Sequence, residues 1–181
     1  MPETGTGFGP IVIAIVRSSW EVLLLRSGPQ ALPRSRLALY GLMSAYLAVD
    51  LLLAAVQGYD AVSVVLQSLL DTGIWVVGYA VLLGLKAALP RLDQTLSAWY
   101  GASTLLMLVS LPLAFAERLP WGPEAQLPIF ILELTLLGWS MMVVANLLRH
   151  AIRVDLVSGF VIGFAFVAAD QTILYLNFSR Y

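Results

Sequence analysis

Cysteine is absent from this 181-residue chain, histidine occurs once, and charged residues make up only 12% of the sequence. Without cysteine, disulfides, thiolate metal sites and cysteine nucleophiles are excluded. A single histidine leaves little for a histidine-rich metal site or a Ser–His–Asp triad. The net charge of −1 gives no basic field that would attract nucleic acid. We therefore expect no catalytic residue, no metal site, no cofactor and no nucleic-acid partner.

Hydrophobic residues, in contrast, account for 60% of the chain. A soluble domain averages about 45–50% apolar residues and about 25% charged residues. A chain this apolar has too little polar surface to enclose a core in water, so we expect lipid to be its solvent. The composition excludes a single soluble domain and makes the lipid bilayer the first expected partner.

Five apolar stretches reach the length of about 20 residues that a helix needs to cross a bilayer. They are residues 37–57, 61–84, 95–115, 127–148 and 156–177. Asp60 stands where an N-cap of the second stretch is expected. The connections are short, which favours antiparallel packing of sequence neighbours. The predicted fold is all-α, an integral membrane bundle of five transmembrane helices over residues 34–181.

The N-terminal segment, residues 1–33, contains a 15-residue amphipathic stretch at 11–25. Arg17 and Glu21 are four residues apart on its polar face, and Trp20 belongs to an apolar face. This stretch is short and charged for a span, so we expect an interfacial helix that lies on the membrane rather than crossing it.

Basic residues are sorted between the two sides of the predicted bundle. The N-terminal segment and two connections hold eight of the ten Lys and Arg residues: Arg17, Arg26, Arg34, Arg36, Lys86, Arg91, Arg149 and Arg153. Only Arg118 and Arg180 fall on the other side. The positive-inside rule then places the N-terminus in the cytoplasm. We expect a bacterial inner-membrane protein with a periplasmic or extracellular C-terminus.

Four carboxyl groups fall inside the predicted spans, at Asp50, Asp71, Glu133 and Asp170. Each costs roughly 2.5–3.5 kcal/mol near the centre of a membrane helix. Counting about 1.5 Å per residue from the outer ends, the four lie about 10 to 15 Å deep, in the outer half of the membrane. No basic residue lies at that depth, so we expect these groups to be neutral.

Two interpretations of these acids remain open. They line a polar cavity that relays protons or holds a cation, with Gln67 and Gln171 as neutral partners. Alternatively, they are neutral groups that hydrogen-bond one helix to another, each worth about 0.6–2 kcal/mol. No ladder of carboxyls crosses the inner half, as a complete relay would require, so the structural interpretation is favoured. A cavity shared by these acids would support the relay or ion-site interpretation, and separate contacts between pairs of helices would exclude that interpretation.

Small residues recur at four-residue spacing. Gly159 and Gly163 form a GxxxG motif, and Ser97 and Gly101 form a related pair. Such spacings let membrane helices approach closely. Packing within one bundle is favoured over dimerisation, because these motifs are common in membrane helices.

Three segments resemble the Yip family of five-span membrane proteins, in particular its small bacterial members. They are residues 23–33, residues 91–101 followed by Pro112, and residues 147–151, with the strings Pro-Gln-x-Leu-Pro and Gln-Thr-x-x-Ala-x-x-Gly. The resemblance covers nearly the whole chain and implies a five-helix bundle with a cytosolic N-terminal region. It brings no catalytic residues. Eukaryotic relatives bind small GTPases through a long N-terminal region that this chain lacks, so GTPase binding is not carried over.

These features predict a membrane-embedded interaction, assembly or shaping factor of the Yip-like type. Its partners would be other membrane proteins or further copies of itself. Its contact surface, on proteins or on the membrane, would be the amphipathic helix and the neighbouring cytoplasmic edge: Arg17, Trp20, Glu21, Arg91, Gln94, Arg149 and His150. The alternative is a small proton- or cation-coupled transporter, or a transporter subunit, that uses the outer-half acids.

Overall fold

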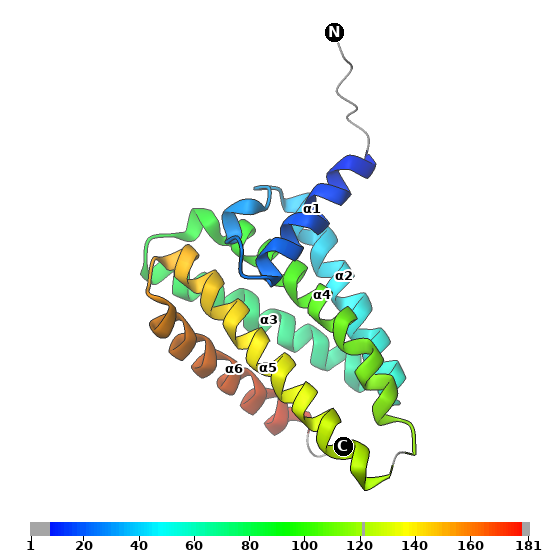
Figure 1. Ribbon diagram of the computed structural model, residues 1–181. Coiled ribbons are helices and arrows are strands. Elements are labelled where there is room, and N and C mark those ends of the chain that lie inside the picture. Colours follow the sequence, from blue (N-terminus) through cyan, green and yellow to red (C-terminus); the bar gives the residue numbers. More distant parts are fainter. Residues whose placement is uncertain (1–7, 121, 179–181) are drawn as a thin grey trace.

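The computed structural model describes residues 8–120 and 122–178, and this part of the chain is built from helices without a strand. Its helices are α1 (Phe8–Leu23), α2 (Arg36–Gln57), α3 (Ala61–Leu85), α4 (Leu92–Glu117), α5 (Pro123–Ile152) and α6 (Leu156–Phe178), with two 3-10 turns, η1 (Pro29–Ala31) and η2 (Leu89–Arg91) (Figure 1). Five of them, α2 to α6, are long and apolar enough to cross a membrane. The all-α, five-span prediction is confirmed.

Local signals explain where several helices begin and end. Ser35 caps α2 by accepting a hydrogen bond from the Ala38 N–H at 3.4 Å, and Asp60 caps α3 through the Ser63 N–H at 2.9 Å. Gly58 ends α2 in the left-handed conformation, with φ of 71°. The helices extend beyond several predicted spans, because a hydropathy window finds only the part of a helix that lies in lipid.

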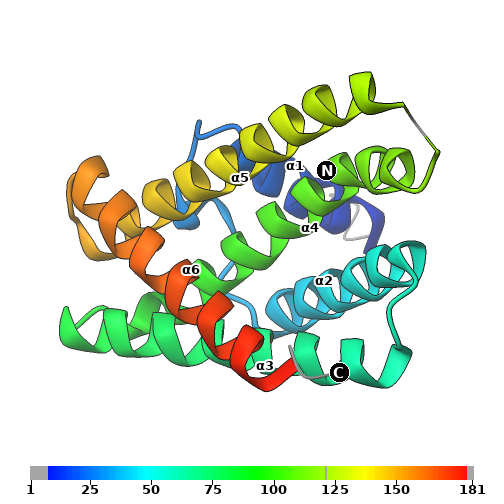
Figure 2. The ribbon, with the colours of Figure 1, turned by 90° about the horizontal axis from the view of Figure 1, so that it is seen from below.

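α4 is the central helix of the bundle. It packs against α1, α2, α3 and α5, while α6 packs against α5 and α3 (Figure 2). The first half of α4 is enclosed, with every residue from Gln94 to Ala102 buried. Its second half is only partly covered, and this difference in packing along one helix positions the site described below.

The two ends of the bundle differ in charge. Arg36, Lys86, Arg91 and Arg149 lie together at what we call the basic end, where α2, α4 and α6 begin. The opposite end, which we call the cavity end, holds Gly58 and Arg118. Arg180, counted in the sequence analysis, lies outside the described residues.

α1 crosses α4 rather than running alongside it (Figure 1). Ser19, Val22 and Leu23 form its buried face, whereas Ile13 and Trp20 are 69% and 44% exposed. The Arg17 guanidinium pairs with the Glu21 carboxylate at 3.3 Å on a third face. The helix therefore has a packed face as well as the polar and apolar faces expected from its sequence.

Hydrogen bonds hold the segment that follows α1 against the bundle. Three side-chain donors bind main-chain carbonyl oxygens at 2.8 to 2.9 Å: Trp139 to Leu23, Asn146 to Ser27, and Gln94 to Leu32. The donors come from α4 and α5, so hydrogen bonds attach residues 23–32 to two of the long helices. This segment is part of the folded unit and not a free tail.

Candidate functional site

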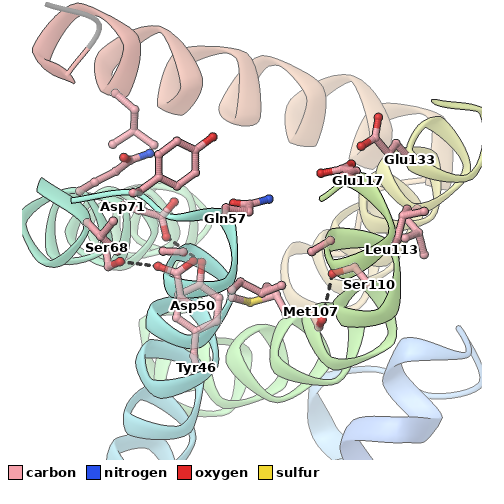
Figure 3. Close-up of a pocket in the computed structure, with 18 of the residues that line it drawn as sticks. Tyr46, Asp50, Gln57, Ser68, Asp71, Met107, Ser110, Leu113, Glu117 and Glu133 are labelled. Atoms are coloured by element: carbon pink, nitrogen blue, oxygen red, sulfur yellow. Dashed lines mark hydrogen bonds between the residues drawn. The ribbon is translucent and has the colours of Figure 1, made fainter. Parts of the chain in front are cut away.

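A cavity of about 570 Å³ lies among α2 to α6 toward the cavity end (Figure 3). Four carboxyl groups line it, Asp50 from α2, Asp71 from α3, Glu117 from α4 and Glu133 from α5. Gln67 and Gln171 also contribute to the wall. No Lys, Arg or His of the described residues lines this space. We call it the acidic cavity.

One wall of the acidic cavity carries Asp50 and Asp71. Both oxygens of Asp71 accept hydrogen bonds, from the Tyr46 hydroxyl at 2.8 Å and from the Trp75 indole N–H at 3.1 Å. Asp50 accepts a hydrogen bond from the Ser68 hydroxyl. These donors come from α2 and α3, so the two carboxyl groups are oriented by the helices that carry them.

Asp170 lies directly behind this wall. It is 2% exposed, and its carboxyl group is near enough to that of Asp71 for the two to interact electrostatically. One of its oxygens accepts from the Gln171 amide at 3.2 Å, and the other has no hydrogen-bond partner within residues 8–120 and 122–178. The fourth predicted acid is thus adjacent to the cavity and not on its surface.

The opposite wall carries Glu117 and Glu133, which Figure 3 shows close together. Sequence reasoning missed Glu117, because the predicted span ended at residue 115. The helix continues to Glu117, which follows Ser110 and Leu113 at the spacing of one helix face, and all three line the cavity. Extending that face by one turn would have found this residue.

Aromatic side chains fill the bundle between the acidic cavity and the basic end. Trp75 and Trp99 stack with ring centroids 4.0 Å apart, and Phe166 packs on Trp75 at 4.7 Å. Tyr46, which holds Asp71, packs edge-on against Tyr100 at 5.3 Å. Most of these rings are buried in the main core. They pack beneath the carboxyl groups, and the indole of Trp75 also donates to Asp71.

The carboxyl groups are spread over two walls instead of converging on one point. Within the part of the chain that the structure describes, no set of three or more His, Asp or Glu side chains is arranged to hold a metal ion. A volume of about 570 Å³ lies in the range of small-molecule pockets, about 300–1,000 Å³. The cavity therefore has the size of a small-molecule pocket and presents hydrogen-bond acceptors from two walls.

The small residues singled out in the sequence pack inside the bundle. A β-carbon on Gly159 would lie 2.7 Å from the Ala145 carbonyl oxygen, and one on Gly163 would lie 2.8 Å from a Val144 methyl carbon. Ser97 and Gly101 are buried, and Gly101 faces the Ser19 side chain of α1. These positions serve contacts of α6 with α5 and of α4 with α1.

Only some of the residues predicted to form a contact surface are exposed. Arg17, Trp20 and Arg149 are exposed and Glu21 is half-exposed, but Gln94 is buried and bonded to Leu32, so it is removed from that surface. Two further residues are engaged internally: Arg91 binds the carbonyl oxygens of His150 and Ala151 at 3.2 and 3.5 Å, and His150 binds the Asn146 carbonyl at 2.8 Å. Polar residues at a span end were expected to face outward, but the docked segment 23–32 covers them.

The chain has no match among family models, curated proteins or solved structures. The resemblance to the Yip family stays a prediction, and functional inference rests on the site itself.

Proposed function

We propose that the protein binds a cationic organic solute in the acidic cavity and acts as a small transporter or a transporter subunit. One observation carries this proposal: four carboxyl groups from four helices line a single cavity without a basic residue from the described part of the chain. Asp50 and Asp71 also accept hydrogen bonds across the contact between α2 and α3, which by themselves would favour a structural role, but these two carboxyl groups face the same cavity as Glu117 and Glu133. Intramembrane acids that share a cavity are instead typical of substrate and ion pathways.

The geometry favours an organic cation over a metal ion. The paired acids on opposite walls, Asp50 with Asp71 and Glu117 with Glu133, offer acceptors to both ends of a bound molecule (Figure 3). Attraction between opposite charges is stronger at low dielectric constant, and a weakly hydrated organic cation gives up less hydration energy on entering than a metal ion does. In the proposed orientation, the basic end faces the cytoplasm and the cavity is filled from outside.

The neighbouring carboxyl groups of Asp71 and Asp170 support coupling to protons. Two carboxyl groups this close in a medium of low dielectric constant repel each other when both are ionised, and we infer that the pair shares a proton. A cation that binds beside Asp71 stabilises its charged form and releases that proton. Solute binding and proton release would then be linked through one pair.

Uptake into liposomes that contain the purified full chain tests this proposal. Ethidium and tetraethylammonium are the probes, and a pH-sensitive dye reports proton movement. We expect saturable uptake that falls at least about tenfold in Asp71→Asn, the equivalent of about 1.4 kcal/mol. Glu124→Gln is the matched control, because Glu124 is an exposed acid of α5 outside the cavity lining. Absence of uptake, or an equal loss in the control, would contradict the proposal.

A membrane-embedded interaction or assembly factor of the Yip-like type is the second candidate. The observation that favours it is the exposed apolar stripe of α1, formed by Ile13, Val16 and Trp20, on a helix that extends away from the spans (Figure 1). A photo-cross-linker at Ile13 tests it in native membranes, with the lipid-facing position Val157 of α6 as the control. Capture of one protein from Ile13 alone supports this role, and capture of lipid only from both positions argues against it.

A further inference from the structure

A second cavity, of about 240 Å³, lies at the basic end. The segment after α1, the start of α4 and the end of α5 form its walls, and its lining includes three basic side chains, Arg34, Arg91 and His150. Gln94 and Thr95 add buried polar groups. We call this space the basic pocket. It lies at the opposite end of the spans from the acidic cavity.

The positive charge of the basic pocket is not neutralised by the protein. In residues 8–120 and 122–178, neither Arg34 nor Arg91 has a carboxylate within 4.0 Å. The acids at this end have other partners: Asp93 pairs with Arg36 at 3.9 Å, and Asp155 accepts a hydrogen bond from the Ser158 N–H at 2.9 Å. Arg34 is exposed and Arg91 is half-buried, and two guanidinium groups that line one partly open pocket without a countercharge repel each other.

The two guanidinium groups are held in place and still have donors to spare. Arg34 uses its Nε to bind the Gln94 amide oxygen at 2.9 Å, and Gln94 is itself fixed by the Leu32 carbonyl. Arg91 uses one terminal nitrogen for the carbonyl oxygens that end α5. A guanidinium has five N–H donors, so each side chain keeps several for a ligand.

His150 adds a third group with a defined orientation. Its Nδ1 lies 2.8 Å from the Asn146 carbonyl oxygen, which only accepts, so Nδ1 carries the hydrogen. Gly28 allows this ring position, because a β-carbon there would lie 2.6 Å from the His150 ring. The remaining ring nitrogen, Nε2, makes no hydrogen bond within the described part of the chain, and His150 lines the pocket.

We propose that the basic pocket binds a phosphate group. Arginine forks match the oxygens of phosphate in bidentate fashion, and two guanidinium groups balance its charge. The pocket lies where the spans end, at the level of lipid headgroups, and basic pockets between membrane helices are known to take anionic headgroups. The phosphate comes either from an anionic phospholipid or from a free phosphate compound, and the experiment separates the two.

Thermal unfolding of the full chain in a neutral detergent provides the test, because a ligand of the folded state raises Tm in a saturable way. The probes are short-chain phosphatidylglycerol, short-chain phosphatidylcholine and inorganic phosphate. We expect phosphatidylglycerol to raise Tm and the variant Arg34→Gln to raise its half-saturating concentration about tenfold. A response to phosphatidylglycerol alone identifies a lipid headgroup, and a comparable response to inorganic phosphate identifies a free phosphate compound.

The matched control is Arg26→Gln, which removes an equal charge at the same end from an exposed side chain outside the pocket. Its half-saturating concentration should equal that of the wild type. Arg34→Lys keeps the charge and loses the fork, so it should show an intermediate value and serves if Arg34→Gln does not fold. An equal response in wild type and Arg34→Gln, an equal loss in Arg26→Gln, or no saturable response to any probe would overturn the proposal. None of these outcomes depends on the acidic cavity.

Discussion

At the residue scale, the intramembrane acids are supported by neutral donors from neighbouring helices. Tyr46 and Trp75 donate to Asp71, and Ser68 donates to Asp50. Such donors reduce the free-energy cost of a carboxyl group in lipid, because an unsatisfied polar group there is more expensive than a bonded one. The same donors fix the direction of each carboxyl group, so residues that lower the cost of these acids also shape the site.

Close approach of α6 to α5 depends on Gly159. We expect Gly159→Ala to destabilise the protein by about 1–3 kcal/mol, because the added methyl group meets the main-chain oxygen of Ala145 and the backbone has no room to yield. Thermal unfolding in detergent measures the effect. Gly138→Ala is the control, since a β-carbon on Gly138 meets nothing within 4 Å. Equal Tm values for the two variants would show that this packing is loose.

The start of α6 gives a pH-dependent contribution to stability. Hydrogen bonds from the hydroxyl and then the main-chain N–H of Ser158 hold the pKa of Asp155 below its usual value. A lowered pKa in the folded state stabilises the protein at neutral pH, and this contribution is lost as the pH falls through that pKa. Asp155→Asn should lower Tm at pH 7, and the difference from wild type should shrink toward pH 3. A difference that is constant with pH would refute this assignment.

At the scale of elements, α1 and the segment after it behave as part of the bundle. α1 presents one face to α4, and the segment is bound by Trp139, Asn146 and Gln94. The 3-10 turn η1 packs on α4 within the same region. This docking also forms one side of the basic pocket, so the N-terminal part of the chain helps to build a site at the basic end.

Asn146 provides a test of this docking. Asn146→Ala leaves the Ser27 carbonyl without its donor, at a cost of about 1–3 kcal/mol. We expect trypsin to cleave faster after Arg26, which is exposed in this segment. Asn177→Ala is the control, because that amide binds the Ile173 carbonyl on the exposed surface of α6. Unchanged cleavage in Asn146→Ala would mean that the other two donors hold the segment alone.

At the scale of the whole molecule, the bundle is most densely packed around the first half of α4, and its larger cavity lies toward the other end. The basic end contains the enclosed half of α4 and the docked segment, and the cavity end contains the acidic cavity. Aromatic rings separate the two regions. Basic side chains therefore gather at one end of the bundle, and the carboxyl groups of the acidic cavity lie toward the other.

If α2 to α6 cross a bilayer, the basic end and the cavity end lie on opposite sides of it. The chain has no cysteine, so a single introduced cysteine is the only thiol that a maleimide can label. Single variants Lys86→Cys and Tyr59→Cys put a thiol at the basic end and at the cavity end, both at exposed positions. A membrane-impermeant maleimide added to intact cells should label only Tyr59→Cys, because the positive-inside rule places Lys86 in the cytoplasm. The reverse pattern would invert the topology, and labelling of both would contradict five spans.

Much of the fold was predictable from the sequence. Each span is a contiguous apolar stretch, and Asp60 and Gly58 mark helix boundaries by local chemistry. Prediction failed where a side chain's surroundings depend on distant parts of the chain. Gln94 was assigned to the surface because it stands near a span end, yet the segment after α1 covers it. Glu117 was overlooked because the apolar window stopped before the helix did.

The sequence by itself determined that lipid is the solvent of this protein, that five helices are long and apolar enough to cross a bilayer, and that basic residues are concentrated at one end of these helices. These are properties of neighbouring residues, since apolar length and charge are counted along the chain. Only the tertiary structure decided that Asp50, Asp71, Glu117 and Glu133 share one cavity while Asp170 lies behind it. The low content of charged residues first indicated lipid, but it did not say where the acidic side chains meet. Their positions relative to one another depend on the rotation and spacing of the helices, which are set by contacts between residues far apart in sequence.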